Sequence, residues 1–173
     1  MKVFKRILQL LLVGTLTFTF YYFYPEEPLP TDKKIDKIIV EKSARKLKVY
    51  SKDELLKTYT ISLGFTPEGH KEIEGDGKTP VGTYTINDKN PNSGYHLNLG
   101  VSYPNAKDRA YAKTLGKSPG GAIKIHGMRN GFGFVGKFHR FWDWTHGCIA
   151  VTDEEVEELY HNISIGTQII LKD

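Results

Sequence analysis

The chain has 173 residues, of which 39% are hydrophobic, 12% aromatic and 25% charged. This length predicts one domain with a small appendage. The formal net charge is +4, but residues 1–24 hold three basic residues and no acidic one, so 21 basic residues face 20 acidic ones in the remainder. A nearly neutral domain gives no reason to expect nucleic acid as a partner. One cysteine excludes an internal disulfide.

The appendage is N-terminal. Lys2, Lys5 and Arg6 make a basic flank within residues 1–6, and residues 7–24 follow without a charge. A bilayer span needs about 17–25 apolar residues, which this run just supplies. Because no small-residue cleavage site follows, we predict an uncleaved signal-anchor in the cytoplasmic membrane, with its basic end in the cytoplasm; a cleaved signal peptide is the alternative. Both place the domain on the periplasmic or extracytoplasmic side.

Residues 25–34 contain PEEPLP and predict a short stiff linker before a domain at residues 35–172. Apolar alternation or short apolar runs predict eight strands, at residues 37–42, 45–50, 55–63, 81–86, 95–101, 122–126, 148–151 and 167–171. Two short helices are predicted, at 105–115 and, after a capping box that starts at Thr152, at 152–161. The pattern predicts a mainly β domain of sandwich or barrel type, preceded by one transmembrane helix.

The candidate chemistry centres on the only cysteine. Cys148 follows His146 and Gly147 directly, and a second His-Gly pair, His126-Gly127, ends an apolar run 22 residues upstream. A thiol nucleophile needs a nearby base and amide donors that face the developing oxyanion. Gly147 removes a side chain, so backbone N–H groups there can approach a substrate oxygen. We therefore predict Cys148 as the nucleophile and the backbone at Gly147 as the oxyanion hole.

Two histidines are candidates for the base. His146 is only two residues from Cys148, whereas His126 is distant in sequence, ends a separate strand and can come across the site; a strand end is a rigid mount for a base. We favour His126 as the general base and His146 as an orienting or wall residue. The substrate side of the site is assigned to Gly127, Arg129, Trp144 and Thr145.

Simpler interpretations compete with these assignments. A lone cysteine is often a small buried apolar residue. His139 is predicted to lie at the surface, and Asp143 to be a solvated charge, with the orientation of a histidine as its alternative. Spacings of 13, 7 and 2 residues fit no usual zinc site, so neither a metal nor another cofactor is expected on the candidate ligands His126, His139, His146 and Cys148.

The stretch Ile125-His126-Gly127, followed by Thr145-His146-Gly147-Cys148, resembles the L,D-transpeptidase catalytic domain, the YkuD family. The resemblance extends to residues 38–64, 75–82 and 118–151 and covers about residues 35–172. It implies a β-sandwich that acts on peptidoglycan stem peptides, with Cys148 as nucleophile and His126 as base. The thiol would attack the bond between diaminopimelate and a terminal D-Ala, and the acyl group would pass to an amine, as in cell-wall cross-linking or remodelling that affects cell shape.

Two features depart from that family pattern. Relatives tend to carry Arg or Asn where this chain has Ala150, and the loop from His126 to Cys148 is longer than usual. Two other functions therefore stay open: a thiol hydrolase that uses the same site, either an L,D-carboxypeptidase or an amidase, and a non-catalytic, membrane-anchored peptidoglycan-binding module. The sequence does not determine the acceptor or the oligomeric state.

Overall fold

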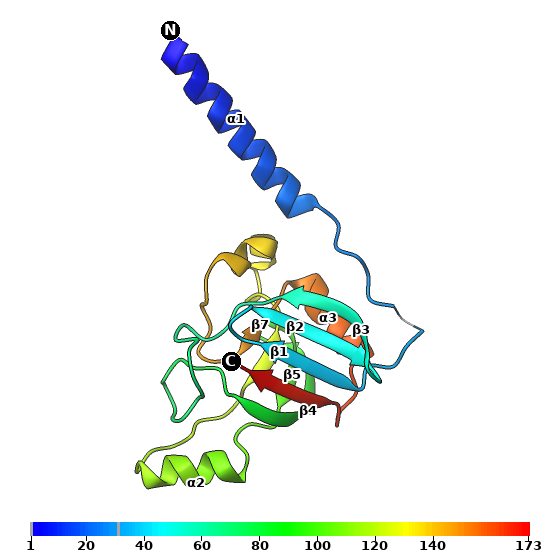
Figure 1. Cartoon of the computed structure of the whole chain (residues 1–173), viewed down its shortest axis with the longest axis vertical. Coiled ribbons are helices and arrows are strands. Elements are labelled where there is room, and N and C mark those ends of the chain that lie inside the picture. The colour runs from blue at the N-terminus through cyan, green and yellow to red at the C-terminus, as the bar shows by residue number, and fades with distance from the viewer. Residues whose placement is uncertain (1, 31) are drawn as a thin grey trace.

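The structure is a computed structural model that describes residues 2–30 and 32–173. In chain order its elements are α1 (Lys2–Phe23), β1 (Lys37–Glu41), β2 (Lys46–Ser51), β3 (Glu54–Thr60), β4 (Gly82–Ser93), β5 (His96–Val101), α2 (Ala106–Thr114), β6 (Lys124–His126), the 3-10 segment η1 (Gly133–Phe141), β7 (Ile149–Ala150), α3 (Asp153–Asn162) and β8 (Gln168–Lys172). Figure 1 shows α1 extending away from the domain that the strands build, with α2 at the opposite end.

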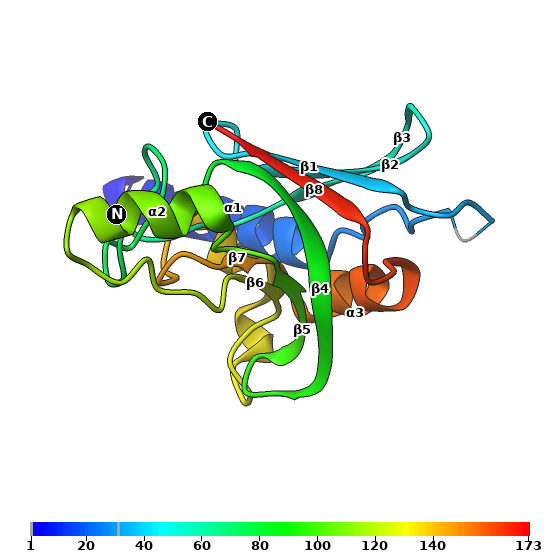
Figure 2. The same cartoon turned by 90° about the horizontal axis from the view of Figure 1, so that it is seen from below.

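The strands form one curled, mixed sheet in the order β3-β2-β1-β8-β4-β5-β6-β7. β4 carries the turn of this sheet, because its first residues pair with β8 and its remaining residues pair with β5. Figure 2 shows β4 as a long, bent strand that runs from one half of the sheet to the other. The pairs β1–β8 and β6–β7 are parallel, and the other pairs are antiparallel. The predicted mainly β sandwich is confirmed.

The core lies between the two halves of the curled sheet. In β1 and β8 every second side chain points inward, and Ile38 and Val40 stand in register with Ile169 and Leu171. Each fully buried aliphatic side chain of this kind stabilises the fold by about 1.5–3 kcal/mol. Their period of two is what made the strands visible in the sequence.

Both predicted helices of the domain are present, and the predicted capping box is confirmed. The Thr152 hydroxyl accepts the Glu155 N–H, and the Glu155 carboxylate accepts the Thr152 N–H. α3 then buries Val156 and Leu159 and packs against β5 and β6. The start of this helix is thereby fixed next to the end of β6, which is where His126 lies.

Three segments differ from their predictions. β4 continues beyond the strand predicted at 81–86, through residues 90–93, because this stretch has β5 as a partner: Ser93 stands opposite His96. β3 ends at Thr60, and residues 61–64 leave it to pair with the segment around Cys148. The long loop from His126 to Cys148 contains η1, whose two turns are joined by a kink at Gly136.

Among the described residues, α1 alone is long and apolar enough to cross a membrane. None of its residues is buried, and it begins at Lys2, so it includes most of the predicted basic flank. The segment that follows it lies against the domain. Leu29 is 3% exposed and belongs to the core, and its N–H donates to Glu158 Oε1 over 2.5 Å.

Gly64 lies where the segment after β3 packs closely against the backbone of Gly77, and a substitution there tests this packing. A Cβ at this position would lie 2.0 Å from the carbonyl oxygen of Gly77, so Gly64→Ala forces two backbone segments apart. We expect the free energy of unfolding to fall by about 2–3 kcal/mol, measured by chemical denaturation followed by circular dichroism. Gly94→Ala is the matched control, because a Cβ there meets no atom within 4 Å. Equal stability of the two variants would contradict the close approach.

Candidate active site

The cysteine sits at the end of a tight turn that Thr145 holds together. The Thr145 hydroxyl donates to the Cys148 carbonyl oxygen over 2.7 Å and accepts the Gly147 N–H over 3.1 Å. Gly147 has a φ of 125°, and a Cβ there would lie 2.5 Å from the carbonyl oxygen of Lys78. Only glycine combines this dihedral with this close approach. The Thr-x-Gly-Cys pattern is therefore explained by the geometry of the turn.

Backbone pairing fixes the cysteine segment on both sides. On one side β7 pairs with β6 in parallel, with Ile125 opposite Ile149 and His126 opposite Ala150. On the other side Ser62 exchanges two backbone hydrogen bonds with Ala150, of 3.0 and 2.9 Å. The residues just before and after Cys148 thus have little freedom to move, as a catalytic mount requires.

His126 and Cys148 lie on the same face of neighbouring strands. His126 is the register partner of Ala150, and Cys148 precedes Ala150 by two residues. Side chains two residues apart in an extended chain point to the same face, so the imidazole and the thiol share one face of the β6–β7 pair. The two predicted site residues therefore lie on neighbouring segments of the sheet, although 22 residues separate them in sequence.

The orientation of His126 leaves one ring nitrogen free. Its Nδ1 lies 2.7 Å from the carbonyl oxygen of Gly127, and a carbonyl only accepts, so Nδ1 carries the proton. Nε2 of the neutral ring is then an acceptor, and it has no hydrogen-bond partner among the described residues. Burial lowers the pKa of His126 below its ordinary value, and the bond to Gly127 offsets only part of this effect. The imidazole is therefore neutral at neutral pH.

The bend that follows His126 is held by α3. Asp153 Oδ1 accepts the Met128 N–H over 2.7 Å, and a Cβ on Gly127 would lie 2.5 Å from the same oxygen. Gly127, assigned above to the substrate side, thus packs beneath the bend and supplies the carbonyl that orients His126.

Two aromatic rings pack on the imidazole. The ring centroid of Tyr95 lies 4.7 Å from that of His126, and Trp144 meets His126 edge-on at 5.7 Å. Tyr95 and Trp144 also stack on each other at 6.4 Å. These rings restrict rotation of the imidazole and provide an apolar wall beside it. Tyr95, which is exposed, was not predicted as a site residue, since no sequence pattern links it to the histidine.

The thiol of Cys148 is half-buried and protonated in this arrangement. Its Sγ donates to the carbonyl oxygen of Ala122 over 3.6 Å. Burial raises the pKa of Cys148 above its ordinary value; the Lys124 backbone N–H and the charges of Lys124 and Lys71 counteract part of that rise. No hydrogen bond joins Cys148 to His126 within residues 2–30 and 32–173. Without substrate, the thiol of Cys148 and the imidazole of His126 are therefore both neutral.

The remaining predicted site residues have different positions. His146 is exposed and meets the ring of Phe65 edge-on at 5.3 Å, so it lies on the outer side of the turn. Arg129 is exposed on the segment after β6. The Gly147 N–H is occupied by Thr145, whereas the Cys148 N–H has no hydrogen-bond partner among the described residues.

Two side chains contradict their predicted surface positions. His139 is 1% exposed, and its Nδ1 lies 3.0 Å from the hydroxyl of Ser62. Burial, the largest cause, lowers the pKa of His139 to about 3, and the charge of Arg140 adds to this effect. Asp143 is a bound carboxylate, which accepts two guanidinium N–H groups of Arg45 and the backbone N–H of Leu63. Both partners come from distant segments, which explains why local sequence gave no signal.

No group of three or more His, Cys, Asp or Glu side chains is arranged to hold a metal ion in the described part of the chain. The chemistry available here is that of one thiol, one oriented imidazole and free backbone N–H groups.

The structure thus has a curled sandwich with a cysteine and an oriented histidine on neighbouring segments of the sheet. The family model of the L,D-transpeptidase catalytic domain, YkuD, matches residues 35–171. The chain belongs to the YkuD family.

Several relatives agree with this membership. YafK of Escherichia coli (strain K12), by name a candidate L,D-transpeptidase, is 28% identical over 133 residues, which are 73% of this chain and 46% of YafK. YqjB of Bacillus subtilis (strain 168), named in the same way, is 28% identical over 152 residues, 86% of this chain and 76% of YqjB.

The fold is also found in solved structures. The K307A mutant of Pgp2, the helical cell shape determining protein of Campylobacter jejuni, superposes with a TM-score of 0.63 at 28% identity, over 84% of this chain and 49% of Pgp2. An L,D-transpeptidase from Mycobacterium smegmatis gives 0.53 at 18% identity, over 79% and 58%, and supports the fold alone. The chain spans about half the length of YafK and of Pgp2.

The neutral resting pair predicts how the thiol reacts with an alkylating reagent. Because the pKa of Cys148 is raised, its thiolate is a minor species at neutral pH. We expect the rate of carboxamidomethylation, followed by intact mass, to rise about tenfold per pH unit from about pH 6 to pH 9. The same chain unfolded in guanidinium, with the ordinary thiol pKa, should react faster at each pH in this range. A rate that is constant across neutral pH would indicate a preformed thiolate–imidazolium pair instead.

Proposed function

We propose that this chain is an L,D-transpeptidase in which Cys148 is the nucleophile and His126 the general base. The observation that carries the proposal is the orientation of His126: Nδ1 is fixed on the Gly127 carbonyl, which leaves Nε2 unpaired, and the strand register puts the His126 side chain on the face that Cys148 shares. A histidine with only a packing role has no need for one ring nitrogen to stay unpaired beside the only thiol of the chain.

The reaction follows from this geometry in two halves. The thiol turns from Ala122 towards His126, gives its proton to Nε2 and attacks the diaminopimelate carbonyl next to a terminal D-Ala. The tetrahedral oxyanion accepts a hydrogen bond from the free Cys148 N–H. The Gly147 N–H, which the sequence suggested as the donor, is already bonded to Thr145. The C–N bond breaks, and D-Ala leaves with the proton from the imidazolium. An amine of a second stem peptide then attacks the thioester, gives its proton to His126 and releases the thiolate, which takes that proton back.

Burial determines the timing of the first proton transfer. It raises the pKa of Cys148 and lowers that of His126, so both charged forms are disfavoured before substrate binds. The proton therefore moves as the sulfur attacks, which is general-base catalysis. Because the base must be neutral, we expect the acid limb of the pH–rate profile to lie below the ordinary pKa of histidine.

The surroundings of the site offer an apolar wall and one exposed cation. The charges of Lys124 and Lys71 lower the pKa of the Cys148 thiol, but each lysine is itself paired with a carboxylate, Asp88 and Asp76 respectively. Trp144 and Tyr95 form an apolar wall on the His126 side. We assign substrate contacts to this wall and to exposed Arg129; Thr145 and Gly127 act by holding the backbone.

We also propose where in the cell the protein acts. α1 anchors the protein in the cytoplasmic membrane, with the domain on the outer side facing peptidoglycan. The similarity to Pgp2, a helical cell shape determining protein, supports a role in remodelling the wall and thereby cell shape.

The test is a muropeptide assay on purified peptidoglycan with the full chain in detergent, read by mass spectrometry. Direct cross-links between two diaminopimelates are expected. Cys148→Ala should abolish them, and His126→Ala should slow their formation by about 10²–10⁴-fold. His161→Ala, an exposed histidine at the end of α3, is the matched control and should be as active as the parent.

Other outcomes of the assay have definite meanings. Shortened or released stems without new cross-links would show hydrolysis at the same site. Products that persist in Cys148→Ala would contradict the proposed nucleophile. Binding to peptidoglycan without any product would favour the non-catalytic module.

A further inference from the structure

The segment around η1 carries a dense group of exposed aromatic side chains. Phe132 is 49% exposed, Phe134 72%, Phe141 60% and Trp142 53%, and all four lie within 132–142. Phe132 and Phe134 also stack on each other at 6.0 Å. Large exposed apolar patches mark interaction sites, including those for membranes. These side chains are separate from the pair Cys148 and His126, and the proposed chemistry does not use them.

This segment lies against the C-terminal turns of α1, as Figure 1 shows for the turn coloured yellow to orange below the helix. The ring of Phe138 is 5.9 Å from that of Phe18 and 5.2 Å from that of Tyr22. The Tyr22 hydroxyl donates to the carbonyl oxygen of Phe134 over 2.8 Å. At Gly136 a Cβ would lie 2.9 Å from the Tyr22 ring, so the glycine permits the close approach.

The contacts place η1 at a definite level of the membrane helix. The uncharged part of α1, which follows Arg6 and ends at Phe23, is about 26 Å long, close to a bilayer core of about 30 Å. Phe18 precedes Tyr24 by six residues, or about 9 Å along the axis. A helix that spans the membrane with Tyr24 at its outer end therefore puts the ring of Phe138, between Phe18 and Tyr22, in the outer part of the hydrocarbon core, next to the interface.

An open apolar groove runs along this contact. It has a volume of about 600 Å³ and reaches the middle of α1. Its walls are aliphatic, aromatic or small, and they comprise Leu10, Leu11, Gly14, Thr15, Phe18, Thr19, Tyr22, Phe23, Phe134 and Phe138. A groove at this depth is open to hydrocarbon chains rather than to water.

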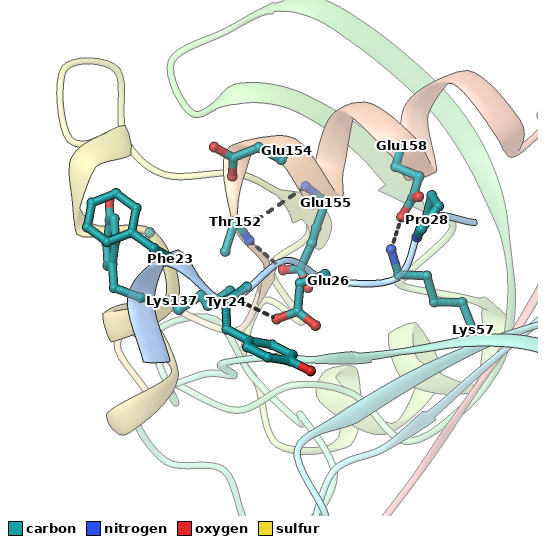
Figure 3. A pocket seen from close by; sticks show the side chains of 12 residues that line it. Phe23, Tyr24, Glu26, Pro28, Lys57, Lys137, Thr152, Glu154, Glu155 and Glu158 are labelled. Carbon is teal, nitrogen blue, oxygen red and sulfur yellow. Dashed lines mark hydrogen bonds and ion pairs between the residues drawn. The ribbon is translucent and has the colours of Figure 1, made fainter. Parts of the chain in front are cut away.

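The charges of the segment are neutralised within the protein. Arg140 bonds Glu155 over 2.7 Å and Glu26 over 3.0 Å, and Lys137 pairs with Glu26 over 3.1 Å. Figure 3 shows Glu26, Lys137 and Glu155 lining the pocket between the end of α1 and the start of α3. The cations thus face inward, and the surface that is left is aromatic, which suits the lipid interface.

From these observations we propose that residues 132–142 are a second membrane contact, in which the exposed aromatic rings insert among the lipids of the outer interface beside α1. The inference goes beyond the proposed reaction and rests only on α1 staying attached as an anchor. It has a consequence for the site: residues 132–142 lead directly into the turn that carries Cys148, so the membrane contact fixes the height and orientation of the thiol above the bilayer. The domain does not rotate freely on a tether.

The test measures contact between lipid and single labelled positions in the full chain. Cys148→Ala removes the only thiol, and Phe134→Cys or Leu115→Cys then introduces one for a nitrobenzoxadiazole label. Leu115 is the matched control, because it is exposed at the end of α2, which lies opposite α1 (Figure 1). In phosphatidylcholine liposomes, replacement of part of the lipid by its 5-doxyl derivative should quench the label at 134 by roughly half or more and the label at 115 hardly at all.

A label at Leu12→Cys, in the middle of α1, reports whether the helix is inserted. Quenching at position 12 without quenching at 134 would overturn the second contact while leaving the anchor in place. Protection of position 134 from both doxyl lipid and aqueous iodide would also overturn it, since the aromatic surface would then be covered by protein. Absence of quenching at both 12 and 134 would overturn the contact together with the anchor.

Discussion

The structure depends on the parallel pairing of β6 with β7. These strands are short, three and two residues, and they are held less by their own hydrogen bonds than by what surrounds them. β5 continues the sheet beyond β6, the segment at 61–64 pairs with the far side of β7, and α3 packs across the group. This enclosure puts a histidine and a cysteine on one face and keeps their backbones fixed.

The same enclosure determines the protonation states. Burial stabilises the neutral forms of both groups, so the thiol is protonated and the imidazole is neutral at neutral pH. The side chains that prepare the site act on the backbone: Thr145 closes the turn, Asp153 fixes the bend after His126, and Asp143 ties the chain before Trp144 to Leu63 and Arg45. In the proposed mechanism, the reactivity of Cys148 therefore depends on the geometry of its turn and on the free ring nitrogen of His126.

The strands and the start of α3 could be predicted from the sequence because they depend on local patterns. Alternating apolar residues marked the strands, and Thr152 with Glu155 marked the start of α3. The nonlocal features were not accessible. His139 is hydrogen-bonded to Ser62, which is 77 residues away in sequence, and Asp143 is bonded to Arg45, which is 98 residues away. The free donor at Cys148, rather than at Gly147, depends on a hydroxyl whose direction no spacing reveals.

The most direct measurement of the central claim is the mass of the intact protein after rapid mixing with a stem tetrapeptide that ends in D-Ala. The account predicts a thioester on Cys148 with the mass of the tetrapeptide acyl group after loss of D-Ala, formed more slowly in His126→Ala and absent in Cys148→Ala. Release of D-Ala by Cys148→Ala at the parent rate would contradict it, because the nucleophile would then lie elsewhere.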